Sequence, residues 1–589
     1  MDLTLANQKI EPSLRAAMGA SPEELAASGD LSTGTTADGL WEIIVLYSGT
    51  ADALGKAFPD YDITFLLGNY AIFRLPKETI TALAASPFII YIERPRRLTF
   101  EVLAGKRASC ISGLQENNTT ALTGKNVLLA VIDSGIDYMH PDFRNLDGST
   151  RILALWDQTI PADTSLDRLP PEGYSLGTLF SQDQINAAIF ADSERERLTI
   201  CPSIDASGHG THVTGIAAGN GRASGGTYRG VAYDASLLIV KLGSPDPKGF
   251  PSTTQLMQAV DYCVRFSIAR GLPLSINLSF GNTYGSHSGT SLLETYLDSV
   301  SELGKICMVV GSGNEGNNGG HAGGFLHSGE TRKLEFAIGD YESSLSIQIW
   351  KNYWDDIRLS LSPPAGAAPI FLYPAPGSRR FGVTGTQILV YYGEPSPYSL
   401  FQEIYIDMLP EKTYIASGVW TITLTAQTVT DGIYDLWMPA AAMRGIATQF
   451  LTPSPDITLT IPSTAARVIT VGAYDSGSNT PAPFSGRGFT WNTDQVKPDL
   501  VAPGVDITSC AVGGGYESRS GTSMATPFVS GSCALLMEWG IQKGNDPFLY
   551  GEKMKAYLVR GAKRLPFAVS YPNPQTGWGA LCVSASLPS

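Results

Sequence analysis

The sequence predicts an α/β protein whose central parallel sheet is flanked by helices. Uninterrupted apolar runs of the kind found in strands buried on both faces occur at residues 127–132, 237–241, 274–278 and 306–310. Segments long enough for helices, such as residues 254–269, alternate with these runs. This alternation is typical of parallel β-α-β units.

The first 95 residues predict a small, separate unit. The expected strands are residues 41–47, 62–68, 70–76 and 88–93, and the expected helices are residues 51–58 and 77–86. The resulting order, β-α-β-β-α-β, is that of a ferredoxin-like fold. Residues 1–40 are polar, rich in Ala and Gly, and predict no defined element.

Residues 326–456 have a different pattern, in which short alternating strands are separated by Gly and Pro turns. The expected strands include residues 334–338, 345–350, 388–392, 403–408 and 419–425. Such a pattern without helices predicts an antiparallel β-sandwich or jelly roll. Because residues 467–471 resume the α/β pattern, we expect the β module to be an insertion. The predicted domains are residues 1–95, 96–325, the inserted 326–456, and 457–589.

The composition predicts a soluble globular protein. Its 589 residues are 43% hydrophobic and 16% charged, with a formal net charge of −14. A negative balance disfavours nucleic-acid binding, which needs a basic face, and no apolar run is long enough to span a membrane. The start of the chain lacks the basic and apolar regions of a signal peptide, so we expect synthesis in the cytoplasm.

The seven cysteines are scattered and odd in number, with no CxxC spacing. This pattern argues against a disulfide framework and against a zinc site. We therefore expect buried or reduced thiols at every position. The residues are Cys110, Cys201, Cys263, Cys307, Cys510, Cys533 and Cys582.

Two motifs place an acid and a base beyond the carboxyl ends of buried strands, where open parallel sheets carry their chemistry. Asp133 ends a strand and is followed by a Ser-Gly turn, so on its own it could equally cap that turn. His209 lies in Gly-His-Gly-Thr-His before an apolar helix, and a neutral imidazole is the usual general base for a hydroxyl. His212 leaves a metal pair as an alternative, but no third ligand follows at a recognisable spacing.

A third motif, Gly-Thr-Ser-Met-Ala-Thr-Pro, places Ser523 before an apolar helix at residues 527–539. A serine in such a position is, by itself, most often a helix cap. A nucleophilic serine also needs a base to accept its proton and an acid to orient that base. The chain order Asp133, His209, Ser523 supplies all three groups in one of the known orders of serine-protease triads. No Gly-x-Ser-x-Gly elbow surrounds Ser523, which argues against an α/β-hydrolase.

A fourth candidate, Asn314, lies in Gly-Ser-Gly-Asn-Glu-Gly just beyond a buried strand. Acyl transfer develops negative charge on the carbonyl oxygen of the substrate, and an aimed amide N–H can stabilise that charge. The alternative is an asparagine that merely stabilises a turn.

Together these motifs resemble the signatures of subtilisin-like serine proteases, the subtilase family. The resemblance covers residues 96–325 and 457–589 and includes Asn-Leu-Ser-Phe-Gly at residues 277–281. It implies that Asp133 orients His209, that His209 deprotonates Ser523, and that Ser523 attacks the peptide carbonyl. The implied oxyanion hole consists of the Ser523 backbone N–H and the Asn314 side chain. The implied substrate-binding residues are Ser279, Phe280, Gly281, Gly311, Ser312 and Gly313.

Residues 91–95 and 105–110 resemble the propeptide junction of the Csp germination proteases of anaerobic spore-forming bacteria. The resemblance implies a propeptide that the enzyme cuts between about Arg96 and Cys110 and then retains as an inhibitor. It also implies no cofactor, a location in the outer layers of the spore, and a protein substrate that is the zymogen of a spore-cortex lytic hydrolase. Two alternatives stay open: a general bacterial subtilase without a spore role, and a catalytically idle scaffold or sensor that binds partners through the β insertion.

Many subtilases bind calcium through a carboxylate that follows the first motif and a loop that follows the histidine helix. Asp142 matches that carboxylate, but the loop at residues 219–226 contains no carboxylates. Because calcium prefers a set of several oxygen ligands, we expect no metal here and interpret His140 and Asp142 as structural.

Overall fold

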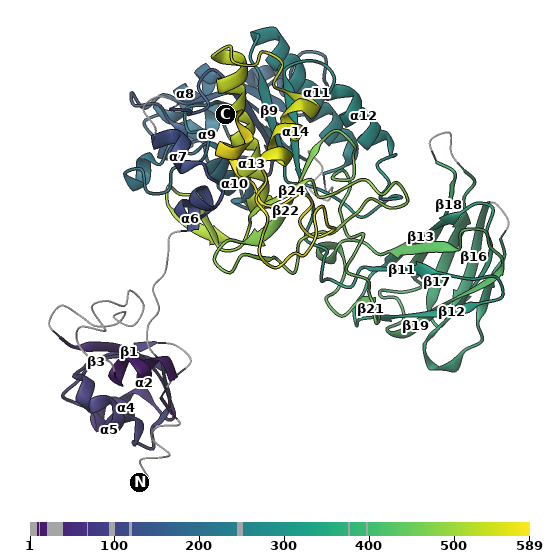
Figure 1. Ribbon diagram of the computed structural model, residues 1–589, viewed down its shortest axis with the longest axis horizontal. Coiled ribbons are helices and arrows are strands. Elements are labelled where there is room, and N and C mark those ends of the chain that lie inside the picture. Colours follow the sequence, from purple (N-terminus) through teal and green to yellow (C-terminus); the bar gives the residue numbers. More distant parts are fainter. Residues whose placement is uncertain are drawn as a thin grey trace. The chain divides into compact units, whose positions relative to one another are not determined.

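The computed structural model describes residues 9–10, 12–19, 39–66, 69–93, 101–116, 121–243, 251–374, 377–395 and 399–588. The chain divides into two compact units, Met1–Thr99 and Phe100–Ser589 (Figure 1). Over the described ranges, no helix combines the length and the apolar character needed to cross a membrane.

The N-terminal unit contains one four-stranded antiparallel sheet in the order β2-β3-β1-β4. Alternate residues of β1 are buried because one face of the sheet packs on the core that the helices share. The ferredoxin-like prediction is confirmed by this strand order. The helix α2 was not predicted from the sequence. Residues 67–68, the end of one expected strand, lie outside the described residues. The elements are α2 (Pro12–Gly19), β1 (Trp41–Tyr47), α4 (Ala51–Ala57), β2 (Asp62–Leu66), β3 (Tyr70–Leu75), η1 (Lys77–Thr79), α5 (Ile80–Ala84) and β4 (Ile89–Glu93).

The second unit is built on a nine-stranded sheet in the order β23-β22-β10-β9-β5-β8-β6-β7, with β24 pairing β22. The pairs from β22 through β6 are parallel, as predicted, whereas the edge strands β7 and β23 are antiparallel. The strands are β5 (Leu128–Asp133), β6 (Ile152–Asp157), β7 (Thr178–Ser181), β8 (Ser236–Lys241), β9 (Leu274–Leu278), β10 (Ile306–Gly311), β22 (Ile469–Asp475), β23 (Thr480–Pro481) and β24 (Leu500–Pro503).

Helices cover both faces of this sheet (Figure 1). Successive residues of β5 enter different cores: Leu129 and Val131 pack with α10 and α13, while Ala130 and Ile132 pack with α11 and α12. Two-sided burial explains why the strands are uninterrupted apolar runs in the sequence. The helices are α6 (Glu101–Ala108), α7 (Ser112–Glu116), α8 (Gln182–Ile189), α9 (Glu194–Ile200), α10 (His209–Ala218), α11 (Thr253–Arg270), α12 (Leu292–Val300), α13 (Thr522–Met537), η7 (Glu538–Gln542), α14 (Gly551–Gly561) and α15 (Val583–Ser586).

The β insertion contains two antiparallel sheets, β11-β20-β13-β18-β17-β16 and β15-β14-β19-β12-β21, which enclose one apolar core. The antiparallel prediction is confirmed, and the specific jelly-roll topology stays a prediction. The strands are β11 (His321–Phe325), β12 (Thr331–Ile338), β13 (Leu345–Asn352), β14 (Asp356–Ser362), β15 (Ile370–Leu372), β16 (Gly377–Val383), β17 (Thr386–Tyr392), β18 (Phe401–Pro410), β19 (Gly418–Thr428), β20 (Ile433–Trp437) and β21 (Gln449–Phe450).

The cysteines correct one expectation. Cys110 and Cys582 form a disulfide across a sequence separation of 472 residues, so the expectation of thiols at every position is wrong for this pair. The backbone N–H of Val583 donates to the Ser109 carbonyl at 3.0 Å, which brings the two chain segments together beside the bond. The other five cysteines are free and buried.

Candidate active site

The end of β5 and the start of α10 bring Asp133 and His209 together. His209 Nδ1 lies 2.7 Å from Asp133 Oδ1, and a carboxylate can only accept, so Nδ1 carries the proton and Nε2 is left as the basic nitrogen. Asp133 Oδ1 also accepts the Ser134 backbone N–H at 2.7 Å. The Asp133 side chain is 1% exposed and the His209 side chain 27%, so the acid is buried while the base faces the surface.

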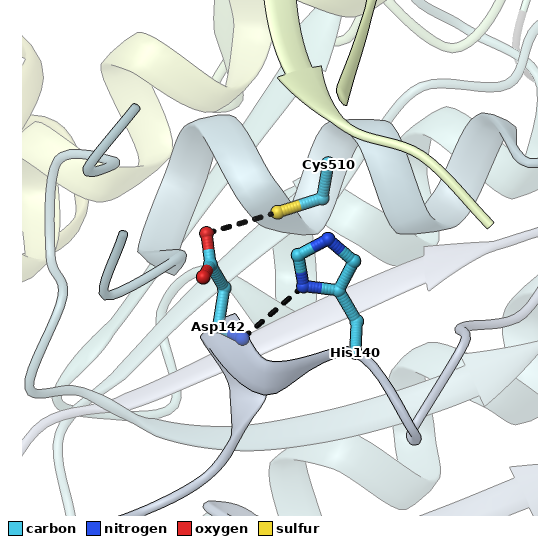
Figure 2. Close-up of side chains that lie close together, drawn as sticks. All are labelled: His140, Asp142 and Cys510. Atoms are coloured by element: carbon cyan, nitrogen blue, oxygen red, sulfur yellow. Dashed lines mark hydrogen bonds between the residues drawn. The ribbon is translucent and has the colours of Figure 1, made fainter. Parts of the chain in front are cut away.

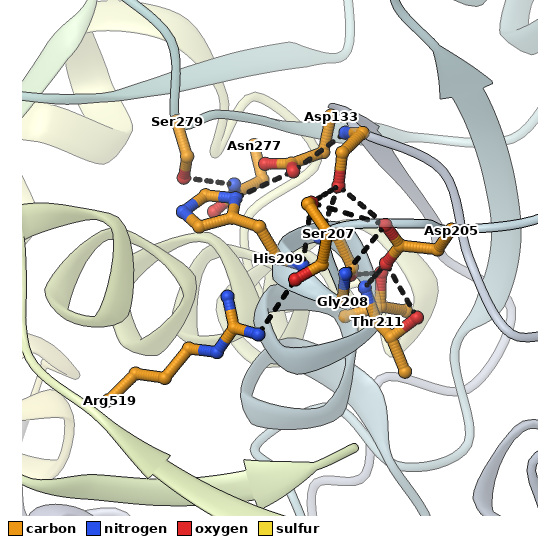
Figure 3. A network of polar contacts seen from close by, with 12 residues as sticks. Asp133, Asp205, Ser207, Gly208, His209, Thr211, Asn277, Ser279 and Arg519 are labelled. Atoms are coloured by element: carbon orange, nitrogen blue, oxygen red, sulfur yellow. Dashed lines mark hydrogen bonds and ion pairs between the residues drawn. The ribbon is translucent and has the colours of Figure 1, made fainter. Parts of the chain in front are cut away.

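A second carboxylate, Asp205, holds the start of α10. Its Oδ2 accepts the Thr211 backbone N–H at 2.8 Å and the Thr211 hydroxyl at 2.7 Å, and its Oδ1 accepts the Gly208 N–H at 3.0 Å and the Ser134 hydroxyl at 2.8 Å. Asp205 thereby connects the turn after Asp133 to the helix that carries His209 (Figure 3). Sequence reasoning missed this residue, although an acidic residue just before a helix is a recognisable capping signal.

Ser523 is the second residue of α13 and is half-buried. Arg519, shortly before it, donates from Nη2 to the Ser207 carbonyl at 2.8 Å, so the start of α13 lies beside the start of α10. Within the described residues the Ser523 hydroxyl makes no hydrogen bond. Catalytic hydrogen bonds of this kind often tighten only when substrate binds. The backbone N–H of Ser523 lies in the first helical turn, which offers it no intrahelical acceptor.

Asn314 is oriented by the residue that precedes Ser523. Its Oδ1 accepts the Thr522 backbone N–H at 3.0 Å and the Thr522 hydroxyl at 3.2 Å. Because the oxygen is used in this way, the amide Nδ2 points away from Thr522 and lies 3.6 Å from where a Cβ on Gly521 would be. The side-chain amide and the Ser523 N–H are therefore donors near the same helix start, as an oxyanion hole requires.

The charges around His209 favour a raised pKa. Burial lowers the pKa of His209, but the charge of Asp133 and its hydrogen bond more than offset this, so the pKa lies above its ordinary value of 6.5. The positive charge of Arg519 acts in the opposite direction. Arg519 is itself held by Glu517, whose Oε1 accepts its Nε–H at 2.9 Å. An accessible basic Nε2 is the group that a serine nucleophile needs in order to give up its proton.

Comparison with known proteins identifies the family of this arrangement. Residues 124–379 and 452–579 match the model of the subtilase family, Peptidase S8. The chain belongs to the subtilase family. Residues 8–96 separately match the Csp protease B prodomain. The structure of the Clostridium perfringens CspB protease superposes with a TM-score of 0.74 at 37% sequence identity, covering 82% of this chain and 96% of that one.

Curated subtilases are more distant. Minor extracellular protease Vpr of Bacillus subtilis is 24% identical over 477 residues, which is 78% of this chain and 50% of Vpr. The PI-type proteinase of Lactococcus lactis subsp. cremoris is 24% identical over 469 residues, 73% of this chain and 23% of that protein. The chain thus spans half or less of the length of these relatives.

The predicted substrate-binding residues of this subtilase lie on two facing segments, residues 279–281 and 311–313. Thr460 lies between them, because a Cβ on Gly281 would be 2.5 Å from its Oγ1 and a Cβ on Gly313 would be 2.4 Å from its Cγ2. Both positions therefore require glycine. The Thr460 backbone N–H donates to the Ser312 carbonyl at 3.0 Å. Sequence reasoning missed Thr460, since the β insertion separates it in the chain from both of the segments that it contacts.

Among the predicted substrate residues, Ser279 and Phe280 also have defined contacts. The Ser279 hydroxyl accepts from the Asn277 side-chain amide at 3.0 Å. Phe280 packs against the core formed with α11 and α12. Both segments thus lie at the carboxyl ends of β9 and β10, which are neighbouring parallel strands.

The predicted structural residues His140 and Asp142 meet Cys510, and the ligand atoms of all three lie within 4.8 Å of one another (Figure 2). Their polar atoms already have hydrogen-bond partners within the protein. His140 Nε2 donates to the Gly515 carbonyl at 3.0 Å, and Nδ1 accepts the Asp142 N–H at 3.1 Å. The Asp142 carboxylate accepts the Tyr516 hydroxyl at 2.8 Å and the Ala223 N–H at 2.8 Å.

These contacts decide how the cluster fits a cation. Burial raises the pKa of the Cys510 thiol well above its ordinary value, which keeps it protonated. A positive charge also lies next to the cluster, since the buried Arg151 donates to the carbonyls of Asp142 and Ala218 at 3.2 and 2.8 Å. The residues present therefore do not fit the calcium site of many subtilases.

His212 lies one turn after His209 in α10 but is fully buried. Its Nε2 lies 3.1 Å from the Glu517 carbonyl. Burial lowers the pKa of His212 to about 4, so the ring is neutral at ordinary pH. The same helix thus carries one accessible basic histidine and one buried neutral histidine, and only the first faces Asp133.

Proposed function

We propose that this subtilase is a serine endopeptidase that removes its own prodomain. The observation that carries the proposal is the hydrogen bond between His209 Nδ1 and Asp133 Oδ1, with the ring edge of His209 left accessible beside the start of α13. The Ser523 hydroxyl attacks the substrate carbonyl carbon while His209 Nε2 takes its proton. The oxyanion that forms accepts from Asn314 Nδ2 and the Ser523 N–H.

His209 then returns the proton to the leaving amine, and the C–N bond breaks to leave an acyl-enzyme. A water molecule attacks the ester carbon, and its proton passes to His209 Nε2. When the Ser523–acyl bond breaks, that proton returns to the serine oxygen. The acid product leaves and the free triad is restored. Asp133 keeps its negative charge throughout and stabilises the imidazolium.

The division of the chain into two compact units supports cleavage close to residues 94–100, a segment that includes Arg96 and lies outside the described residues. The helix that follows, α6, is part of the second unit: Gly105 packs against the ring of Phe528, and Lys106 Nζ donates to the Gly230 carbonyl at 3.2 Å. Cys110 is bonded to Cys582. A cut before Glu101 therefore divides the chain without breaking either folded unit.

The test is intact mass and N-terminal sequencing of purified wild type beside Ser523→Ala. We expect two fragments from the wild type, with the new N-terminus within residues 94–101, and one uncut chain from the variant. Fragments from both proteins would show that another protease does the cutting. An uncut wild-type chain that also fails to react with a fluorophosphonate would favour the idle-scaffold alternative.

We further propose that the physiological substrate is the zymogen of a spore-cortex lytic hydrolase and that the protease resides in the outer layers of the spore, with its prodomain retained as an inhibitor. The match to the Csp protease B prodomain and the likeness to the C. perfringens CspB protease support this role. Incubation of the zymogen with wild type should release the mature hydrolase, and Ser523→Ala should not. Self-processing without zymogen cleavage would leave a general subtilase as the function.

A further inference from the structure

The β insertion begins directly after the segment that carries Asn314. Only residues 315–320 separate this asparagine from the first inserted strand, β11. The near end of that segment is anchored in the catalytic core, where Gly316 N–H donates to the Phe484 carbonyl at 2.9 Å. The far end is anchored in the insertion, because Gly319 and Gly320 accept the N–H groups of Phe450 and Met438 at 2.9 Å each. The position of Asn314 therefore depends on two domains.

A relay of hydrogen bonds joins Asn314 to a buried arginine of the insertion. Asn318 Nδ2 donates to the Asn314 backbone carbonyl at 2.6 Å. The carbonyl of Asn318 in turn accepts from Arg444 Nη2 at 2.6 Å. Arg444 is 8% exposed, and its other nitrogens donate to the carbonyls of Pro439, at 2.9 Å from Nε, and of Thr448. The guanidinium thus ties the Asn314 segment to one bend of the insertion.

A second contact runs in parallel with this relay. The carboxylate of Glu315, the residue next to Asn314, accepts the backbone N–H of Ala441 at 3.2 Å from each oxygen. Ala441 lies in the same bend as Arg444, within the short helix η6 (Ala441–Met443). Two residues of the segment that follows Asn314, Glu315 and Asn318, are therefore held by one small part of the insertion. The Asn314 side chain is held separately by Thr522.

We propose that Arg444 is a positioning residue that acts through Asn318 to hold Asn314 in place for stabilisation of the oxyanion. The inference rests on the proposed function, since it assigns a role within the same reaction. A donor contributes fully only when it is aimed at the developing charge, and removal of such a donor costs ~10²–10³ in turnover. Loss of the relay lets Asn314 move without removing its amide. We therefore expect turnover to fall by at least ~10-fold, but by no more than the ~10²–10³ that loss of the donor itself costs.

The test is a double-mutant cycle on the full chain, with two readouts: the rate of self-processing, and the rate at which a fluorophosphonate acylates Ser523. Arg444→Met keeps an apolar chain of similar length and removes the donors. We expect Arg444→Met and Asn314→Ala each to slow both rates by ~10-fold or more. The double variant should be no slower than Asn314→Ala alone, because Arg444 then has nothing left to position.

The matched control is Arg332→Met, which removes an exposed arginine of the insertion whose partner is Glu330 and should change neither rate. The acid limb of the pH–rate profile should stay in place in Arg444→Met, since Asp133 and His209 are untouched. If Arg444→Met fails to fold, Asn318→Ala takes its place in the test. It removes only the relaying amide and should slow both rates by ~10-fold or more.

Two results would overturn the relay. One is that the losses of the two single variants multiply in the double variant. The other is a folded Arg444→Met protein that reacts at the wild-type rate, whatever its thermal stability. A different result points to a different failure. If Asn314→Ala reacts as fast as wild type, the oxyanion assignment of the proposed function is wrong, and the relay is wrong with it.

Discussion

Two histidine–aspartate pairs with nearly the same N–O distance, but with different ring nitrogens, lie in different regions of this protein. In the catalytic core His209 Nδ1 lies 2.7 Å from Asp133, and where the β insertion meets that core His321 Nε2 lies 2.8 Å from Asp435. The histidine of the first pair is 27% exposed, whereas that of the second is 2% exposed. A short N–O distance alone therefore does not identify a catalytic pair.

The surroundings of the two carboxylates differ as well. Both oxygens of Asp435 are used, since Oδ2 accepts the indole N–H of Trp491 at 2.6 Å. Trp437 is stacked with both His321 and His287, at ring distances of 4.9 and 4.3 Å. In contrast, Asp133 Oδ2 is buried without a hydrogen-bond partner among the described residues. In the insertion pair both carboxylate oxygens are used and the ring is buried, with His321 Nδ1 left without a partner among the described residues. In the core pair one carboxylate oxygen is unused and the ring is accessible.

The largest expected difference between the pairs is in activity. Asp133→Asn should lower the rate of Ser523 acylation by ~10⁴, because the amide favours the wrong tautomer of His209. Asp435→Asn should leave the rate of the folded protein unchanged. Stopped-flow acylation by a fluorophosphonate measures both, and equal losses in the two variants would remove the distinction between them.

Stability should show the opposite order. Asp435→Ala leaves the N–H groups of His321 and Trp491 buried and unpaired, so we expect a loss of about 3 kcal/mol or more in the free energy of unfolding. Asp133→Ala should cost less, because Asp133 Oδ2 has no partner to lose and the partly exposed His209 can bond to water instead. Denaturant unfolding followed by tryptophan fluorescence measures the change, with exposed Asp340→Ala as the control.

The smallest expected effect is a shift in pH dependence. His209 must be neutral to act as a base, so activity should fall as pH drops through a pKa that lies above 6.5. Arg519→Gln removes a positive charge that lowers this pKa, so the pKa should rise and the acid limb of the pH–rate profile should move to higher pH. A limb that moves to lower pH, or stays in place, would contradict this account. Arg265→Gln, which removes an exposed charge on α11, is the matched control.

The sequence determined the elements and the local positions of the candidate chemistry. Continuous apolar runs predict strands buried on two faces, alternating runs predict the inserted sheets, and both predictions are confirmed. Asp133 at a strand end and His209 at a helix start lie where their flanking residues predict. These features are local, because backbone periodicity and capping act over a few neighbouring residues.

Only the tertiary structure decided which distant residues meet. The bond between Cys110 and Cys582, the place of Thr460 between two glycines, and the contact of Arg444 with Asn318 all join segments far apart in the chain. The sequence pattern shows that a residue is buried, but its partner depends on how whole elements pack and on how the insertion is seated. For the same reason, the pairing of His321 with Asp435 was not predicted from the sequence.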